Sequence, residues 1–375
     1  MRQAVVFALF FWLLSFFGGS AAAAAERYWQ IGADIGITYD SNVFATDADE
    51  ESDSLVELRP WIELKRPVGD ITIFRGKYIL AGKMYSDFDD ANTVEHDLVA
   101  EISFKGNRFY GKVFEGFIFK SYPISGEVVG KEDNWRNTLK AHFGAGYEKL
   151  GWEVGVVWER QDFKDIDAYD YDDYSFYAEG NYRFGTETMT YVTISIGEVT
   201  YSDDTHNDAS YFDVKVGLRG SLADKTTYDL GAGMQSRDYD DGGTLADEED
   251  YSSVSFAASL KYKYSEKTSV AASLSYKPTE SVTANYYESL YFGLTVHWAV
   301  TEKIFLKSLL SLEDGKSSGA AENDFTKFTI SASGHYAIRD WIGIMLEITA
   351  ESRDTDAATG SYDRQTIGAF VSMRY

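Results

Sequence analysis

Apolar and polar residues alternate strictly over many short segments of the chain. The last segment places Ile367, Ala369, Val371, Met373 and Tyr375 on one face, with small or polar residues between most of them. Strict alternation over several residues is typical of a β-strand whose two faces meet different surroundings. The alternation recurs to the end of the chain, and no helical periodicity competes with it. The pattern therefore predicts a chain built almost entirely of strands.

Eighteen segments show this alternation. They cover residues 28–39, 54–66, 70–87, 94–105, 108–121, 135–148, 151–163, 173–184, 188–202, 210–221, 225–238, 251–264, 267–277, 286–299, 302–313, 324–337, 340–352 and 363–375. The fifth segment is the least regular, because Lys112 and Glu115 disturb either choice of apolar face.

The connections between these segments alternate in length. Short turns alternate along the chain with longer acidic segments. The short turns include 67–69, 106–107 and 185–187, and the longer segments include 203–209 and 240–250. A transmembrane barrel has this asymmetry, because its periplasmic turns are tight and its extracellular loops are longer. A soluble sandwich has no reason to sort its loops in this way. We therefore expect an antiparallel up-and-down β-barrel of about 18 strands with both termini on the periplasmic side.

Aromatic residues mark a common depth along the predicted strands. They end the apolar faces of strands that precede a short turn: Phe104, Tyr147, Phe184, Tyr264, Trp298, Tyr336 and Tyr375. Aromatic rings at one depth form the girdle of a membrane barrel. Strand propensity alone explains many aromatics, but not their shared depth.

The first 25 residues differ from the rest of the chain. One positive charge at Arg2 precedes an apolar stretch over 4–17, and small residues follow to Ala25. This is the pattern of a cleaved secretory signal peptide, and the apolar stretch is too short for a membrane-spanning helix. We expect residues 1–25 to be removed and residues 26–375 to form one barrel in the outer membrane.

The composition of the chain limits the kinds of molecule that the protein is expected to bind. The formal net charge is −25, which argues against nucleic acid, and the chain contains no cysteine. An outer-membrane barrel would instead contact lipid and lipopolysaccharide. The acidic segments 47–51 and 247–250 lack the spacing of a dedicated calcium loop, so no metal site or cofactor is predicted.

If the apolar faces contact lipid, the opposite faces line the interior. The candidate pore-lining residues on those faces are Arg75, Lys77, Lys83, Lys140, Arg183, Asp213, Lys215, Arg219, Lys261, Lys263, Lys307 and Glu347. A polar interior in an eighteen-stranded barrel is wide enough for water, which predicts a porin-like pore whose charges tune what passes. Changing Lys215 and Arg219 to Glu should then shift selectivity and leave folding intact. The alternative is a structural or adhesive barrel whose interior is closed by side chains.

Two further patterns concern assembly and catalysis. The carboxyl end resembles the signal that the outer-membrane barrel assembly machinery reads, with Tyr375 last and apolar Met373 and Val371 two and four places before it. No G-x-S-x-G motif is present, and His297 and His335 are expected near the periplasmic end. No enzymatic activity is therefore predicted.

A family resemblance rests on the first hairpin. Tyr39-Asp40-Ser41-Asn42-Val43-Phe44 closes the first strand, and Leu58-Arg59-Pro60, Tyr85, Asp87-Phe88-Asp89-Asp90 and His96 follow. This part of the chain resembles the beta-barrel porin 2 family, which is found with exopolysaccharide biosynthesis operons. The resemblance implies passage or export of a polysaccharide, or a porin-like path that serves such a system. Asp40 and Asn42 also suit a turn, since both side chains can cap the local backbone.

Overall fold

The computed structural model describes residues 28–47, 50–121, 132–240, 242–244, 250–281, 284–318, 324–357 and 360–375. These residues form eighteen strands and two short 3₁₀ turns. The elements are β1 Trp29–Asp40, β2 Asp53–Val68, β3 Thr72–Tyr85, η1 Asp89–Ala91, β4 Thr93–Lys105, β5 Phe109–Lys120, β6 Asn134–Gly146, β7 Leu150–Phe163, η2 Asp167–Tyr169, β8 Tyr171–Arg183, β9 Thr188–Tyr201, β10 Ala209–Ala223, β11 Thr226–Tyr239, β12 Tyr251–Ser265, β13 Thr268–Glu280, β14 Tyr286–Ala299, β15 Ile304–Ser317, β16 Phe325–Arg339, β17 Ile342–Thr355 and β18 Tyr362–Arg374.

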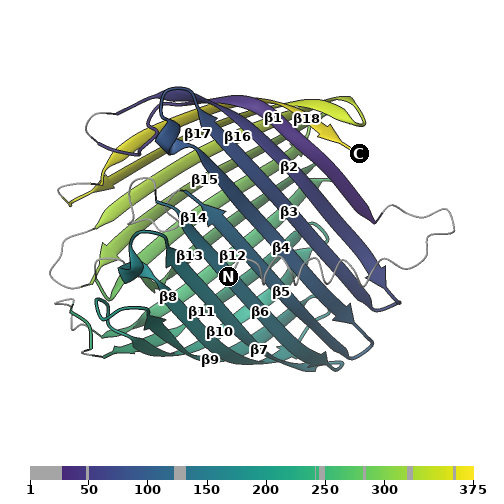
Figure 1. The fold of residues 1–375 in the computed structure, drawn as a ribbon. Helices are drawn as coiled ribbons and strands as arrows, with labels where there is room; N and C mark the ends of the chain where they lie inside the picture. Colours follow the sequence, from purple (N-terminus) through teal and green to yellow (C-terminus); the bar gives the residue numbers. More distant parts are fainter. Residues whose placement is uncertain are drawn as a thin grey trace.

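The strands form one closed antiparallel sheet. Each strand pairs with its neighbours in sequence, and β1 pairs with β18, from Gly32 opposite Arg374 to Asp40 opposite Thr366 (Figure 1). This seam between β1 and β18 leaves the sheet without a free edge. The predicted fold, an up-and-down barrel of eighteen strands, is confirmed.

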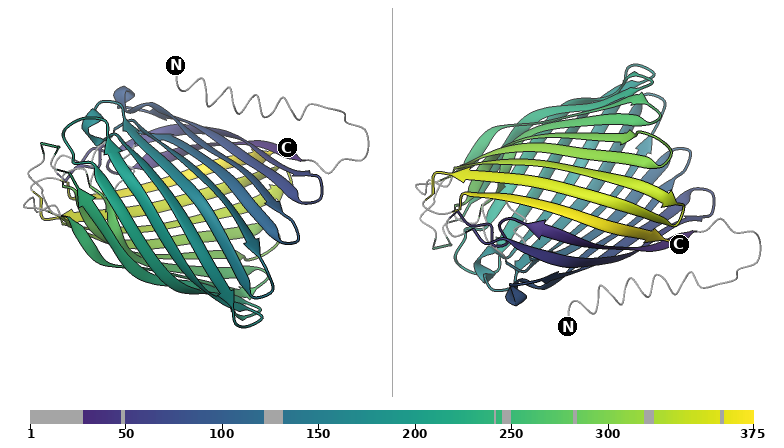
Figure 2. Two further views of the ribbon diagram at one scale, coloured as in Figure 1. Left: turned by 90° about the horizontal axis from the view of Figure 1, so that it is seen from below. Right: turned by 90° about the horizontal axis from the view of Figure 1, so that it is seen from above.

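The connections sort by length as predicted. At one end of the barrel the strands are joined by two to four residues, and at the other end by five to thirteen. The chain's last residue lies at the end with the short turns (Figure 2). There the Tyr375 N–H donates to the Ile31 carbonyl over 2.7 Å, and the Tyr375 ring lies 6.0 Å from the Trp29 ring. Trp29 and Tyr375, near the two ends of the described residues, therefore meet at one rim.

Large apolar side chains cover the outer face of the barrel. Ile37, Leu346 and Ile194 are exposed there, as are Tyr147 and Tyr336 of the predicted aromatic girdle. Exposed apolar side chains on this scale are stable only where lipid replaces water. On the opposite face, side chains two or more strands apart touch one another, which is feasible only where a curved sheet is concave. That face lines the interior, here called the lumen.

The fifth strand, whose face was ambiguous in the sequence, is settled by its contacts. The Lys112 ammonium lies 2.8 Å from Glu101, a lumen-facing carboxylate on β4. Glu115 consequently points outward, opposite Ala100 and Leu139. Its carboxyl group is hydrogen-bonded to the side chain of Asn137 on β6. A polar pair thus lies on the outer face halfway along β5, where each group reduces the desolvation cost of the other.

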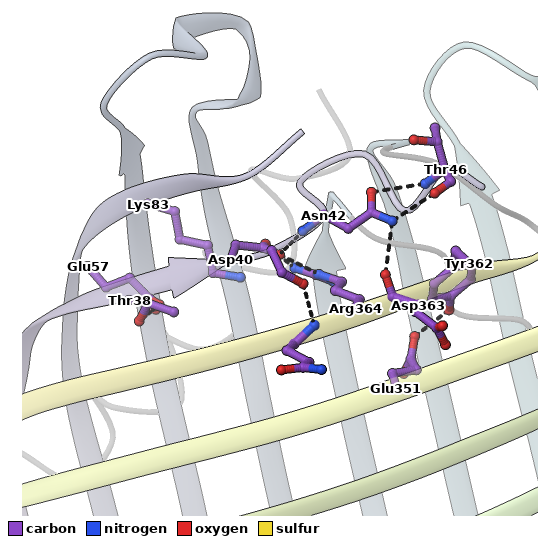
Figure 3. Close-up of polar contacts among 12 residues, drawn as sticks. Thr38, Asp40, Asn42, Thr46, Glu57, Lys83, Glu351, Tyr362, Asp363 and Arg364 are labelled. Atoms are coloured by element: carbon purple, nitrogen blue, oxygen red, sulfur yellow. Dashed lines mark hydrogen bonds and ion pairs between the residues drawn. The ribbon is translucent and has the colours of Figure 1, made fainter. Parts of the chain in front are cut away.

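Polar side chains fasten the seam at the end with the long loops. Arg364 on β18 donates from Nε and Nη2 to the two carboxylate oxygens of Asp40, over 3.0 and 2.6 Å (Figure 3). Asn42 donates from Nδ2 to the carbonyls of Thr46 and Asp363, and its Oδ1 accepts from the Thr46 N–H. Asp40 and Asn42 are fully buried. We call Asp40, Asn42, Asp363 and Arg364 the seam cluster.

The segment that follows Asn42 packs into a small apolar core. Val43, Leu55, Tyr85 and Ala91 are buried together, and Phe44 and Phe88 pack against them. The Asn42 N–H also donates to Asp40 Oδ1 over 3.2 Å, as expected of a capping residue. The residues that carry the family resemblance therefore build the corner where the first strand leaves the sheet.

Several sequence predictions lie outside the described residues. The signal peptide 1–25 does, and so do parts of the acidic segments 47–51 and 247–250. Across the described part of the chain, no helix is long and apolar enough to cross a membrane.

We expect Asn42→Ala to destabilise the barrel by about 2–3 kcal/mol, because Asn42 is fully buried and its three side-chain hydrogen bonds, one of them to the Asp363 carbonyl, are lost. Ser41→Ala is the matched control, because the Ser41 hydroxyl accepts one bond from the Gln365 N–H at an exposed position that water can fill. The measurement is the temperature at which the folded, heat-modifiable band disappears on electrophoresis. Equal midpoints for the two variants would refute a structural role for Asn42.

The predicted assembly signal generates a second expectation. Val371 and Tyr375 are exposed on the outer face, and the Tyr375 main chain closes the last rung of the seam. Tyr375→Asp keeps that rung but removes the ring, whereas Tyr375→Phe keeps both the rung and an aromatic side chain. We expect the Asp variant, and not the Phe variant, to reach the outer membrane in reduced amounts. Normal amounts of folded Asp variant would show that the ring is not read during assembly.

Candidate functional site

The lumen wall carries the candidate residues. Arg75, Lys83, Lys215, Arg219 and Glu347 each lie within 4 Å of an oppositely charged group on that face. The other candidates also lie on the lumen face, as shown by the strand register or by the recesses that they line. Asp213 lies beside Lys215, and the remaining six are Lys77, Lys140, Arg183, Lys261, Lys263 and Lys307. That any of them meets a passing solute stays a prediction.

Ion pairs dominate the wall on either side of the seam. Arg59 on β2 contacts Glu57 over 2.7 Å and reaches across β1 and β18 to Glu347 on β17 over 2.9 Å. Its guanidinium also lies 4.2 Å from the Phe370 ring, and Thr38 donates to Glu57. These groups line a recess of about 410 Å³. The charges here mostly neutralise one another.

A second network lies halfway round the barrel on β7 to β11. Arg219 lies 2.6 Å from Glu179 and 3.6 Å from Asp229, with its guanidinium 4.1 Å from the Tyr191 ring. The Tyr191 hydroxyl donates to Asp229 over 2.9 Å. Arg219 is therefore held by two carboxylates and a ring rather than free to shape the field in the lumen alone.

Aromatic and charged side chains pack closely at the end with the long loops. Arg237 bonds Glu280 from two strands away, and Tyr201 donates to the same carboxylate over 3.3 Å. Tyr211 donates to Asp173 over 2.7 Å. Arg237 is buried and Tyr201 is half-buried, so this layer supports the loops rather than offering an open binding site.

The loops above this layer are tied together. Asn207 donates from Nδ2 to Asn285 over 3.0 Å and accepts from the Gly243 N–H over 2.8 Å, which joins three loops. In the neighbouring loop, burial raises the pKa of Asp170 to about 6, although the Phe163 N–H donates to its carboxylate. Asp170 is thus partly protonated in mildly acidic surroundings.

The wall formed by β12 to β16 has a different character. Small hydroxyl side chains line it, for example Ser259, Ser273 and Ser331. Lys261, Lys263, Lys277 and Lys307 stand among them, and for these four the described residues provide no carboxylate oxygen within 4.0 Å. These four positive charges are therefore unpaired in the described structure, whereas Lys327 on β16 pairs with Glu351 over 3.4 Å.

Two recesses near the short turns are lined by basic residues. One, of about 580 Å³, includes Lys261, Lys263, His297, Lys307 and His335. The other, of about 1300 Å³, lies between β3 and β10 and includes the cationic side chains Arg108, Lys112, Lys149 and Arg183. In the residues that the structure describes, no three histidine or carboxylate side chains gather as metal ligands would.

The alternation of residues between the two faces of each strand could have identified further charged residues in the lumen. Arg59, Arg136, Arg237, Lys277, Arg353 and Arg364 occupy the lumen face and were not among the candidates. Arg59 was read only as part of the Leu58-Arg59-Pro60 motif, although its position alternates with the outward Leu58. Which cations are paired could not be found in this way, because several pairs, such as Arg59–Glu347 and Arg219–Glu179, join strands that are not neighbours in sequence.

A family model described as Putative beta-barrel porin 2 matches residues 136–375. The chain belongs to this family. The match covers β6 to β18 and confirms the predicted membership, although the first-hairpin motif that suggested it lies outside the matched residues. With its closed eighteen-stranded sheet, this beta-barrel porin 2 member is a porin-like outer-membrane β-barrel.

Solved structures resemble this porin family member at low identity. OccK2 (OpdF) of Pseudomonas aeruginosa shares 10% identity, with 92% of this chain and 98% of that chain covered and a TM-score of 0.48. A BenF-like porin from Pseudomonas fluorescens Pf-5 shares 10% identity, with 93% and 99% covered and a TM-score of 0.47. The siderophore receptor PirA from Pseudomonas aeruginosa shares 10% identity, with 94% and 81% covered and a TM-score of 0.46. The search of curated proteins found no match.

The contacts of Arg219 change the expectation, drawn from the sequence, that replacing Lys215 and Arg219 with Glu leaves folding intact. Arg219→Glu would place three carboxylates together, one of which, Glu179, is buried. We expect a loss of stability between the ~1 kcal/mol of an exposed pair and the ~3–5 kcal/mol of a buried one. Lys263→Glu, at an unpaired site, should cost little. Midpoints of urea unfolding for the two variants provide the test, and equal midpoints would contradict the network's structural role.

Proposed function

We propose that this barrel is a water-filled diffusion channel for small hydrophilic solutes. The observation that carries the proposal is the chemistry of the interior wall. A barrel that served only as a scaffold could fill its interior with apolar side chains, as small barrels do. This wall instead carries ion pairs, unpaired lysines and a field of serine hydroxyls, all of which favour water.

The family supports the same reading, since its description is that of a porin. Porins are not enzymes, and we propose that this chain has no catalytic activity. The passage of a polysaccharide, implied by the sequence resemblance, stays a prediction on which no contact described above bears. The structural or adhesive alternative differs in one measurable property, which is the absence of conductance.

Export of the chain and its insertion into the outer membrane form a second part of the proposal. We infer that residues 1–25 direct export and are cleaved near Ala25, that the barrel assembly machinery inserts the mature chain, and that the barrel then contacts lipid and lipopolysaccharide. The support is the charge and apolar pattern of the amino terminus and the apolar outer face of the barrel.

Conductance tests the channel directly. The purified, heat-modifiable barrel in a planar lipid bilayer should give stepwise increases in current. Ser331→Trp places a bulky ring on the lumen wall, whereas Ile330→Trp places it at the next residue on the outer face. We expect the first variant to lower single-channel conductance and the second to leave it unchanged. A folded wild-type barrel that conducts nothing would favour the structural alternative.

A further inference from the structure

On one part of the lumen wall, formed by β12 to β16, the local charge is opposite in sign to the charge of the whole chain. The chain carries a formal net charge of −25. On the lumen face of β12 to β16, however, five lysines stand against two carboxylates, Glu280 and Glu313. Glu280 is held by Arg237, and Glu313 accepts a hydrogen bond from Ser289. This wall therefore has a local excess of positive charge.

The excess is available to a solute. Within the described residues, Lys327 has an ion pair, with Glu351 over 3.4 Å, and the other four lysines have none. Lys261 and Lys263 lie on one face of β12, two residues apart, which places their Cα atoms about 7 Å from each other. Lys307 on β15 joins them around the recess of about 580 Å³, together with His297 and His335. Three lysines thus line one recess, whose rim also carries Glu266, and in the described structure no carboxylate oxygen lies within 4.0 Å of their ammonium groups.

The side chains around these lysines favour a solute with carboxylate or phosphate oxygens over an apolar one. Serine hydroxyls beside the lysines, including Ser269 and Ser333, can donate to carboxylate or phosphate oxygens. Lys307 also lines the recess beside the seam, where Ser331 and Thr349 continue the hydroxyl surface. Lysines spaced along a wall bind an anion at successive positions, so it can enter and still leave.

We propose that the channel selects small organic anions with two or more negative charges, and that Lys261, Lys263 and Lys307 form their binding site. This proposal rests on the proposed function for passage of the solute, but binding itself does not require an open channel. The paired cations near the seam and around Arg219 maintain the wall, whereas these three lysines contact the solute.

The test compares two triple variants with equal loss of charge. Lys261→Gln, Lys263→Gln and Lys307→Gln remove the proposed site. Lys164→Gln, Lys225→Gln and Lys303→Gln remove three lysines from loops and turns outside the recess. Both triples are first checked for a heat-modifiable barrel. Reversal potentials in a KCl gradient report selectivity, and titration calorimetry with citrate on the detergent-solubilised barrel reports binding.

We expect the wild-type and control barrels to be anion-selective and to bind citrate, and the site triple to lose citrate binding and to shift its reversal potential toward cation selectivity. A conducting wild-type barrel that binds no citrate and shows no anion preference overturns the proposal. A wild-type barrel that binds citrate through these lysines but does not conduct retains the site and defeats the channel instead. If the site triple fails to fold, the single variant Lys261→Gln provides the same comparison.

Discussion

Closure of the sheet is the constraint on which the rest of this structure depends. A strand inside lipid has no water to satisfy its N–H and C=O groups, so every strand must find a partner on both sides. In this chain the last free edge is removed by pairing β1 with β18. Once the sheet is closed, alternation along each strand has only one meaning: one face meets lipid and the other meets the lumen. The polar wall, its recesses and its ion pairs all follow from that division.

The division also separates two kinds of charge in the lumen. Near the seam and around Arg219, Arg59 and Arg219 each have a carboxylate within bonding distance, and these pairs reach over intervening strands. Such pairs restrain neighbouring strands while contributing little net field. On β12 to β16, Lys261, Lys263 and Lys307 stand among serines and are exposed to the lumen, whereas Lys327 is paired with Glu351. One barrel thus has a wall that is held together by ion pairs and a wall on which most of the lysines have no carboxylate partner in the described structure.

The sequence alone was sufficient for the strands, their order and the sorting of connections, because a period of two and the length of a turn are local properties. It was also sufficient for the faces of most lumen residues, since parity carries along a strand. It failed at β5, where Lys112 and Glu115 both point to their polar partners, Glu101 and Asn137, on β4 and β6. It could not separate Arg219, held by Glu179, from Lys261, which is unpaired. That distinction depends on the curvature and stagger of the closed sheet, which bring together residues far apart in the chain.

The seam cluster has a kinetic consequence. Asp40 and Arg364 are 324 positions apart, and Asn42 and Asp363 are 321 positions apart. Neither contact can exist before the first and last strands have met, so the cluster cannot stabilise any earlier state of assembly. An interaction that is absent from the transition state slows unfolding without accelerating folding. If these strands meet only after the transition state, the buried carboxylate and amide at this corner slow the opening of a finished barrel without changing the rate at which it closes.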